Sequence, residues 1–204
     1  MKKKEKTILL WLTLSLFAAA GIVPTGAQNA KPAQGLRSPD VVFVPTPEEV
    51  VDAMLKVAKA GKGDIVYDLG SGDGRIPITA VQKFGVDRAV GIDINPERIQ
   101  EAVANAKAAG VEGRVQFLNQ DLFQSKISDA TVVTLYLLES LNIKLLPKLL
   151  RDLRPGTRVV SHAFSMGGWK PQQALNVDGR MVYFWVIPEK GSAEYKAALA
   201  ASKG

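Results

Sequence analysis

The residues of this chain best suited to chemistry are three alternating glycines and the two acids beside them. Residues 65–75 read Ile-Val-Tyr-Asp-Leu-Gly-Ser-Gly-Asp-Gly-Arg, so that Asp68 precedes the glycines and Asp73 lies between the last two. Apolar, β-prone residues come before this stretch, and apolar residues at helical spacing follow it. The pattern therefore predicts a buried strand that turns sharply into a helix. Glycines at the turn leave room for a ligand against the main chain, because they carry no Cβ atom.

The spacing and charge of this turn discriminate between possible ligands. A dinucleotide-binding turn has the order Gly-x-Gly-x-x-Gly and places a pyrophosphate on the helix N-terminus. Here Gly70, Gly72 and Gly74 alternate, and the next residue is Arg75. The flanking carboxylates would repel a pyrophosphate, so the turn favours a ligand with a cationic end. A nicotinamide oxidoreductase is accordingly disfavoured.

Two further acids follow the strands predicted next along the chain. Asp93 follows the apolar residues 89–92, near the offset of about 20 residues at which a carboxylate accepts hydrogen bonds from a ribose diol. Asp121 follows the strand predicted at 115–118, although aspartate is also an ordinary turn residue. Ligands of open α/β sheets bind at the carboxyl ends of the strands, which is where both acids would lie.

The Asp-x-Gly-x-Gly-x-Gly pattern resembles motif I of the class I S-adenosylmethionine-dependent methyltransferases. The resemblance covers roughly residues 45–188. It implies S-adenosyl-L-methionine as the cofactor and an α/β, Rossmann-like fold: a mostly parallel seven-stranded sheet with a C-terminal antiparallel hairpin. It also implies cofactor-binding residues, with the methionine end held by Asp68, Gly70, Ser71, Gly72 and Asp73, the ribose by Asp93 and the adenine by Asp121.

Four shorter stretches narrow the resemblance. They are Val-Pro-Thr-Pro at 44–47, the glycine motif at 68–75, Leu-Tyr-Leu-Leu-Glu-Ser-Leu-Asn at 135–142, and Ser-His-x-Phe at 161–164 before Gly-Trp-Lys-Pro at 168–171. Together they resemble the small protein-lysine methyltransferases related to the ATP synthase c-subunit enzyme, whose glycine motif is similar to that of Dot1. This resemblance implies protein-lysine N-methylation. A small-molecule methyltransferase and a non-catalytic exported binding domain with the same fold stay open.

Methyl transfer from a sulfonium is an in-line displacement that needs alignment and a dry site more than a dedicated base. An apolar pocket lowers the pKa of an amine by itself. Tyr136, Phe164 and Trp169 are our candidates for the walls of the substrate channel, and no catalytic residue is assigned. His162 could serve as a general base, but we interpret this single histidine at a strand end as a structural, hydrogen-bonded residue. The Asn/Asp-Pro-Pro-aromatic motif of many amino-methylating relatives is missing after the strand predicted at 130–138, which argues against nucleic-acid bases as acceptors.

Helix and turn signals surround these residues. Thr46, Pro47 and Glu49 predict a capping box at the start of a helix that Gly61 ends. Asn95 before Pro96 predicts the cap of another helix. The remaining predicted features are a leucine-rich helix closed at 154–156, a hairpin turn at 178–179, and a segment at 43–46 that could line the cofactor mouth.

Composition limits the classes of protein and site. The 204 residues are 47 % hydrophobic and 23 % charged, as expected for one globular domain. The chain has no cysteine, which excludes disulfides and thiolate chemistry, and its one histidine excludes a multi-His metal site, so no metal is expected. Half of the net charge of +6 belongs to residues 1–27, and the mild remainder gives no case for nucleic acid. We expect a monomer.

The ends of the chain have a different character. Residues 1–27 carry lysines, then an apolar run and small residues, which predicts a signal peptide cleaved after Ala27 or an uncleaved membrane anchor. Residues 28–40 are interpreted as a linker, 41–188 as the methyltransferase domain and 189–204 as a tail without function, at most a frayed helix. We therefore expect an exported protein, periplasmic or secreted, with membrane contact only through an uncleaved N-terminus.

Overall fold

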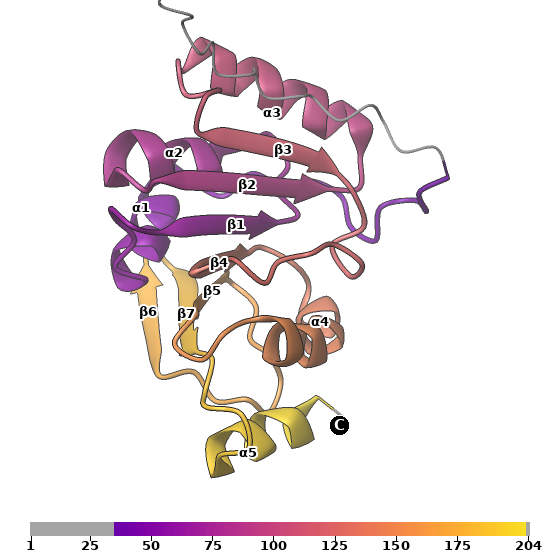
Figure 1. Cartoon of the computed structure of the whole chain (residues 1–204), viewed down its shortest axis with the longest axis vertical. Coiled ribbons are helices and arrows are strands. Elements are labelled where there is room, and N and C mark those ends of the chain that lie inside the picture. Colours follow the sequence, from indigo (N-terminus) through magenta and orange to yellow (C-terminus); the bar gives the residue numbers. More distant parts are fainter. Residues whose placement is uncertain (1–34, 203–204) are drawn as a thin grey trace, which may run out of the picture.

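The computed structural model describes residues 35–202 (Figure 1). The predicted signal peptide or anchor at 1–27 and the first part of the predicted linker lie outside these residues.

A seven-stranded sheet in the order β3-β2-β1-β4-β5-β7-β6 forms the middle of the molecule (Figure 1). The first five strands of this order are parallel, and β7 is antiparallel to both β5 and β6. The predicted fold class is confirmed. The strands are β1 (Ile65–Leu69), β2 (Arg88–Asp93), β3 (Val115–Asn119), β4 (Val132–Leu135), β5 (Arg158–His162), β6 (Gln173–Val177) and β7 (Arg180–Val186).

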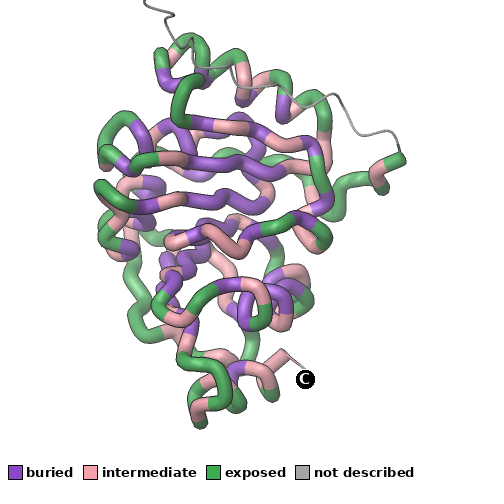
Figure 2. Tube along the Cα trace, viewed as in Figure 1, coloured by how far each residue is buried: buried purple, intermediate pink, exposed green. Residues whose placement is uncertain are grey.

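Helices cover both faces of the sheet, because adjacent residues of each central strand point to opposite sides. Val66 belongs to one apolar cluster with α1, α2 and α3, whereas Tyr67 belongs to the other with α4 and α5. Figure 2 shows the central strands as buried over most of their length. The helices are α1 (Glu48–Val57), α2 (Arg75–Phe84), α3 (Pro96–Ala108), α4 (Glu139–Asp152) and α5 (Ala193–Ala201).

The predicted capping box at the start of α1 is wrong. Pro47 is the N-cap residue, and no side chain of the described residues caps the helix. The hydroxyl of Thr46 instead lies 3.2 Å from Nδ1 of His162, a residue on β5. The Thr46 hydroxyl therefore interacts with His162, which is distant in sequence, and not with the helix amide that the local pattern predicted. The other predicted cap is confirmed, since Oδ1 of Asn95 accepts from the Glu97 amide at 2.8 Å.

The C-terminal region is better ordered than a frayed tail. Helix α5 packs against α4, and Ala198 is fully buried between them. Ser192 caps this helix by accepting from the amide of Tyr195 at 3.0 Å. The hairpin turn is confirmed, because Asp178 and Gly179 both have positive φ, as a two-residue turn between twisted strands requires.

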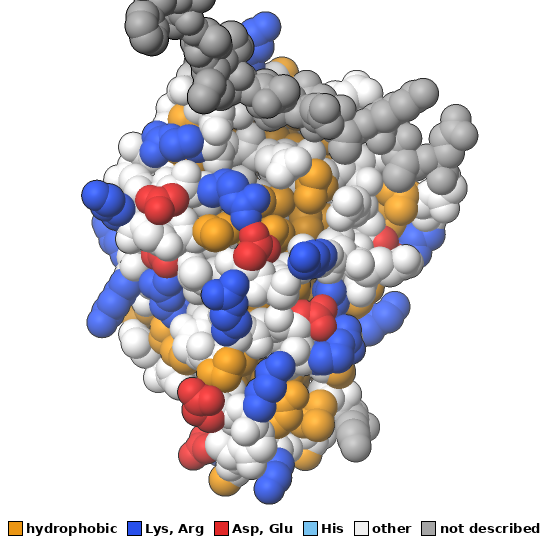
Figure 3. Space-filling model, viewed as in Figure 1, with side chains coloured by type: hydrophobic (Ala, Val, Ile, Leu, Met, Phe, Trp, Pro, Cys, Tyr) orange, Lys and Arg blue, Asp and Glu red, His pale blue; other side chains and the backbone are white. Residues whose placement is uncertain are grey.

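The surface carries mixed charge. On the face in Figure 3, lysine and arginine side chains lie scattered among acidic, apolar and uncharged groups. None of the described helices is long and apolar enough to cross a membrane.

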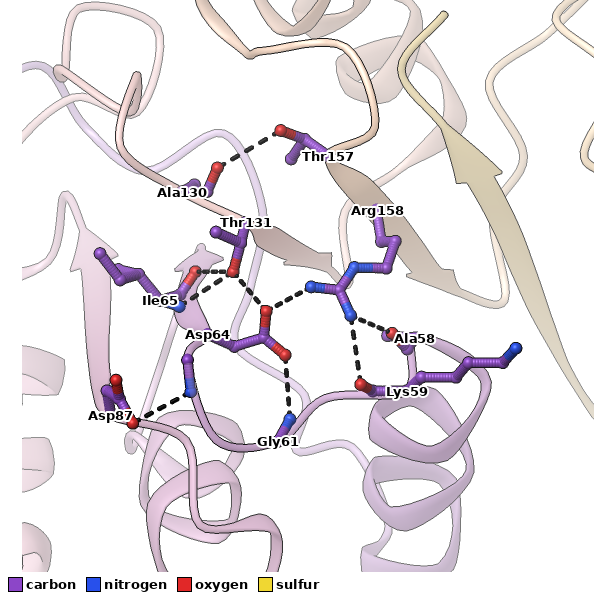
Figure 4. A network of polar contacts seen from close by, with 11 residues as sticks. Ala58, Lys59, Gly61, Asp64, Ile65, Asp87, Ala130, Thr131, Thr157 and Arg158 are labelled. Carbon is purple, nitrogen blue, oxygen red and sulfur yellow. Dashed lines mark hydrogen bonds and ion pairs between the residues drawn. The ribbon is translucent and has the colours of Figure 1, made fainter.

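A polar network joins four chain segments at the amino ends of the parallel strands (Figure 4). Asp64, just before β1, accepts from the Gly61 amide at 2.9 Å and from the Thr131 hydroxyl at 2.7 Å. Its carboxylate also pairs with the guanidinium of Arg158 at the start of β5. Arg158 donates in turn to the Ala58 carbonyl at the end of α1, at 2.8 Å. One carboxylate thus fixes the starts of β1, β4 and β5 relative to α1.

Replacing this carboxylate should destabilise the fold. Asp64→Ala is expected to lower the free energy of unfolding by about 2–4 kcal/mol, because Arg158 would keep a partly buried charge without its partner. Urea titration followed by circular dichroism measures the loss. The exposed Asp87, which accepts from the Gly63 amide at 3.1 Å, supplies the control. Equal losses in Asp64→Ala and Asp87→Ala would contradict the assigned importance of the network.

Candidate functional site

A cavity of about 610 Å³ opens at the carboxyl ends of β1 to β4. Its walls come from the loops after these strands and from the segment before α1. The sequence predicts that residues 43–46 line the mouth of the cofactor site, and Phe43, Val44 and Thr46 do line this cavity. The predicted site residues that line it are Asp68, Gly70, Ser71, Asp73, Asp93, Asp121 and Tyr136.

The glycine turn is held to the end of β2. The amides of Gly70 and Ser71 both donate to the Ile92 carbonyl, at 2.8 and 3.0 Å. Gly72 has a φ of 51°, and a Cβ atom there would lie 2.1 Å from the ring of Phe43. The space that this glycine leaves is therefore filled by a side chain of the protein itself. The guanidinium of Arg98 lies over the same ring, 5.2 Å from its centroid.

Asp93 supports the turn as well as facing the cavity. One carboxylate oxygen accepts from the Gly72 amide at 2.9 Å, and the other accepts from the Asn95 amide at 2.9 Å. Each oxygen keeps a further lone pair, since a carboxylate offers about four acceptor sites. Asp93 can therefore hold the glycine turn and accept from two vicinal hydroxyls at once.

Asp68 is the buried acid of the cavity, with only 2 % of its surface exposed. Its carboxylate accepts from the Thr134 hydroxyl at 2.7 Å. Burial raises the pKa of Asp68 to about 8, against the opposing effect of the Thr134 hydrogen bond and with smaller contributions from the charges of Asp93 and Asp73. The hydroxyl of Ser71 is buried close to Gly91 of β2 and has no hydrogen-bond partner within the described residues. A cationic ligand would satisfy the buried carboxylate of Asp68.

Asp73 has a partner already. Its carboxylate binds the guanidinium of Arg75, with Oδ1 3.0 Å from Nε. Arg75 also donates to the Thr46 carbonyl at 3.0 Å, which ties the turn to the segment before α1. Of the two acids that flank the glycines, Asp68 is thus the one available to a cationic ligand.

Asp121 lies at the other end of the cavity and binds a residue that sequence reasoning missed. Its carboxylate accepts from the Phe123 amide at 2.9 Å and from Nε of Arg37 at 3.0 Å. Burial raises the pKa of Asp121, but the bonds from Arg37 and Phe123 outweigh it and leave the pKa below its ordinary value. Arg37 belongs to residues 28–40, which are interpreted from the sequence as a linker. The described part of this stretch, residues 35–40, contacts the domain through the bond from Arg37 to Asp121. No local pattern marked this arginine.

The aromatic candidates separate into two places. The ring of Tyr136 lies 3.9 Å from that of His162 and 6.3 Å from that of Phe164, between ring centroids. Phe164 thus backs Tyr136 without lining the cavity. Trp169 lies elsewhere: its ring packs 5.8 Å from that of Trp185, and its carbonyl accepts from the Trp185 indole at 2.9 Å. Trp169 covers the apolar cluster under α4 and α5.

His162 is buried and is held by Thr46 and Tyr136. Burial, with a smaller contribution from the charge of Arg180, lowers the pKa of His162 to about 4. The imidazole is therefore neutral at pH 7, and its observed contacts are with Thr46 and Tyr136. Among residues 35–202, no cluster of three or more acidic or histidine side chains is arranged to hold a metal ion.

The donor set fits one cofactor. Asp68 can bind an ammonium group, Asp93 can accept from a ribose diol, and Asp121 can accept from an adenine amino group. All three lie at the carboxyl ends of neighbouring parallel strands. Fold and site together define a class I S-adenosylmethionine-dependent methyltransferase.

Comparison with known proteins narrows this class. The family model described as the ANTKMT methyltransferase domain matches residues 68–173. A protein-lysine N-methyltransferase of Saccharolobus islandicus (strain REY15A) is 54 % identical over 155 residues, covering 74 % of this chain and 96 % of that protein. The adenine nucleotide translocase lysine N-methyltransferase of Mus musculus is 34 % identical over 131 residues, covering 64 % of this chain and 56 % of that protein.

A solved structure adds a further relative. It is described as an RNA methyltransferase from Salinibacter ruber in complex with S-adenosyl-L-homocysteine. It has 53 % sequence identity and a TM-score of 0.71, and the match covers 74 % of this chain and 97 % of that one. The chain belongs to the ANTKMT methyltransferase family.

The double use of Asp93 predicts two separable effects. Asp93→Ala should weaken cofactor binding by about a hundredfold, since charged hydrogen bonds contribute about 1.5–3 kcal/mol each. It should also lower the melting temperature, because the Gly72 and Asn95 amides lose their acceptor. Titration calorimetry with S-adenosyl-L-homocysteine measures the first effect and thermal unfolding the second. Glu112→Ala, which changes an exposed acid before β3, is the control, and unchanged affinity in Asp93→Ala would refute the ribose assignment.

The raised pKa of Asp68 predicts pH-dependent binding. Below pH 8 this carboxyl is largely protonated in the free protein, and a bound ammonium favours its ionised form. Affinity should therefore rise from pH 6 to pH 8, with a proton released on binding. By the same linkage, the raised pKa makes the free protein less stable as the pH rises from about 4 to 8.

Calorimetry in buffers of different ionisation enthalpy measures this proton release. Asp68→Asn should abolish the part of the pH dependence due to this carboxyl, while the ligand's own amino group titrates equally with both proteins. Identical pH profiles for the wild type and Asp68→Asn would count against the assignment of Asp68 to the cationic end.

Proposed function

We propose that this chain methylates lysine side chains of a protein. The observation that carries the proposal is the 54 % identity to a protein-lysine N-methyltransferase, of which this chain covers 96 %. We assign the acceptor to the part of the cavity between β4 and α4, where the lining residues Tyr136, Leu137 and Leu141 form a largely apolar wall, as a lysine-methylating site needs. Asp68, Gly70, Ser71, Gly72, Asp73, Asp93 and Asp121 are the proposed cofactor residues, by direct contact or by holding the turn.

S-adenosyl-L-methionine, when bound, supplies a methyl group on a sulfonium that a neutral amine can attack. The chain's own residues supply position and dryness. Asp68 neutralises the cationic end, and Asp93 and Asp121 fix the nucleoside. The apolar wall lowers the pKa of an entering lysine, so that its proton leaves to water before the attack. Alignment of the two reactants then provides most of the rate gain.

RNA is the competing macromolecular acceptor, because a relative at 53 % identity is described as an RNA methyltransferase. Two observations favour protein. Lysines and arginines exceed acids by only three outside residues 1–27, and the residues after β4 read Tyr-Leu-Leu-Glu in place of Asn/Asp-Pro-Pro-aromatic.

We also propose, from the lysines and apolar run of residues 1–27 alone, that the protein is exported or anchored at its N-terminus.

Methyl transfer to defined acceptors tests the proposal. The full-length protein is given S-adenosyl-L-methionine with a labelled methyl group and a peptide library in which one lysine is flanked by varied residues. We expect label on the lysine Nζ by tandem mass spectrometry, and none in a library with acetylated lysines. Structured RNA is supplied in parallel. Label in RNA alone would transfer the assignment to RNA, and the cofactor-binding variant Asp93→Ala shows whether any label is enzymatic.

A further inference from the structure

The loop after β5 contains a strained turn beside the site. Ala163 has a φ of 62°, in the left-handed region that residues with a Cβ atom rarely adopt. The Phe164 amide donates to the His162 carbonyl at 2.7 Å, which makes the three residues a γ-turn. Such a backbone persists only where its surroundings hold it, and strain of this kind concentrates at functional sites.

Asn142, in the first turn of α4, is one of the groups that hold the turn. Its side chain is fully buried, and Nδ2 lies 3.1 Å from each of the carbonyl oxygens of Phe164 and Ser165. The Ser161 hydroxyl is a third neighbour at 3.2 Å. The amide oxygen of Asn142 has no partner within the described residues. The reversed amide would set an oxygen against two carbonyls, so the two loop carbonyls fix its orientation.

The turn connects this amide to the wall of the cavity. Phe164 follows Ala163 directly; its ring stacks on that of Tyr136, which lines the cavity, whereas Phe164 does not line it. Tyr136 rests on His162 as well, so both of its aromatic supports belong to the same turn. The Ala163 amide donates to the Met181 carbonyl at 2.7 Å, which fixes one end of the turn. The other end is held by α4, where Asn142 binds the Phe164 and Ser165 carbonyls and Glu139 accepts from the Ser165 hydroxyl.

We propose that Asn142 is a positioning residue for the methyl acceptor: it holds the strained turn at Ala163 so that Phe164 and His162 keep Tyr136 against the cavity. The inference rests on the proposed function for the identity of the acceptor. It distinguishes the two halves of the site, since Asp68 and Asp93 lie at the carboxyl ends of β1 and β2, Asp121 follows β3, and within the described part of the chain none of these acids is hydrogen-bonded to this turn. The link between the halves is indirect and runs through Thr46, whose hydroxyl meets His162 and whose carbonyl accepts from Arg75. Loss of Asn142 should therefore change the use of the acceptor and leave the affinity for the cofactor unchanged.

The test compares Asn142→Ala with Ser161→Ala, which removes the third neighbour of the amide and leaves both loop carbonyls bound. Asn142→Ala should lower kcat/KM for the lysine peptide that the wild type methylates best by at least tenfold. Its calorimetric Kd for S-adenosyl-L-homocysteine should stay within about twofold of the wild type. Ser161→Ala should alter neither quantity by more than about threefold.

A second variant separates positioning from a general loss of stability. Ala163→Gly removes the strain, because glycine accepts a positive φ. Added to Asn142→Ala, it should restore a substantial part of kcat/KM, since the turn then needs less holding. If Asn142→Ala lowers cofactor affinity in parallel with methyl transfer, or if Ala163→Gly restores stability without transfer, the inference is overturned.

A readout without turnover keeps this inference distinct from the proposed function. NMR of the Tyr136 and His162 rings in the full-length protein reports their stacking directly. Asn142→Ala should shift these signals, and Ser161→Ala should leave the Tyr136 ring nearly unchanged. A wild type that methylates no lysine would defeat the proposed function. Unshifted Tyr136 and His162 signals in Asn142→Ala would defeat the positioning role, whatever the acceptor.

Discussion

The site depends on one joint, where the glycine turn after β1 is bonded to the end of β2. Two amides of the turn share the Ile92 carbonyl, and a third donates to Asp93. Three elements of the cofactor side are placed relative to this joint: α2 begins from it, Phe43 packs on it, and Arg75 connects it to the segment before α1. The acid expected to hold the ribose is thus also a structural part of the loop, and the two roles reside in one carboxylate.

The amino ends of the parallel strands have a structural role, whereas their carboxyl ends form the binding site. At the amino ends, Asp64, Thr131 and Arg158 satisfy one another and leave little for a ligand. At the carboxyl ends, Asp68 is buried against a single hydroxyl, and the Ser71 hydroxyl has no partner among residues 35–202. Buried polar groups normally find partners within the protein, so a buried carboxylate that lines a cavity and is held by one hydroxyl is available to a ligand.

Sequence patterns predicted what depends on local order and on the parallel-sheet rule. The glycine turn, the acids at the end of β2 and after β3, the Asn95 cap and the hairpin at Asp178 all follow from residue type and spacing. The failures involve partners distant in sequence. Thr46 has the local context of a helix cap but meets His162, 116 residues away. Trp169 follows β5 closely, yet the sheet brings Trp185 to it and draws it away from the cavity.

Arg37 gives the segment before α1 a thermodynamic role. It occupies the carboxylate of Asp121, the acceptor expected for adenine, so a bound nucleoside must share that carboxylate or displace the guanidinium. Binding of the nucleoside and binding of Arg37 to Asp121 are then linked equilibria, and such linkage is reciprocal. If the ligand displaces the segment, then holding the segment in place lowers the affinity for the ligand by the same factor. A tether on the N-terminal side of Arg37 would therefore act on cofactor affinity without touching the cofactor.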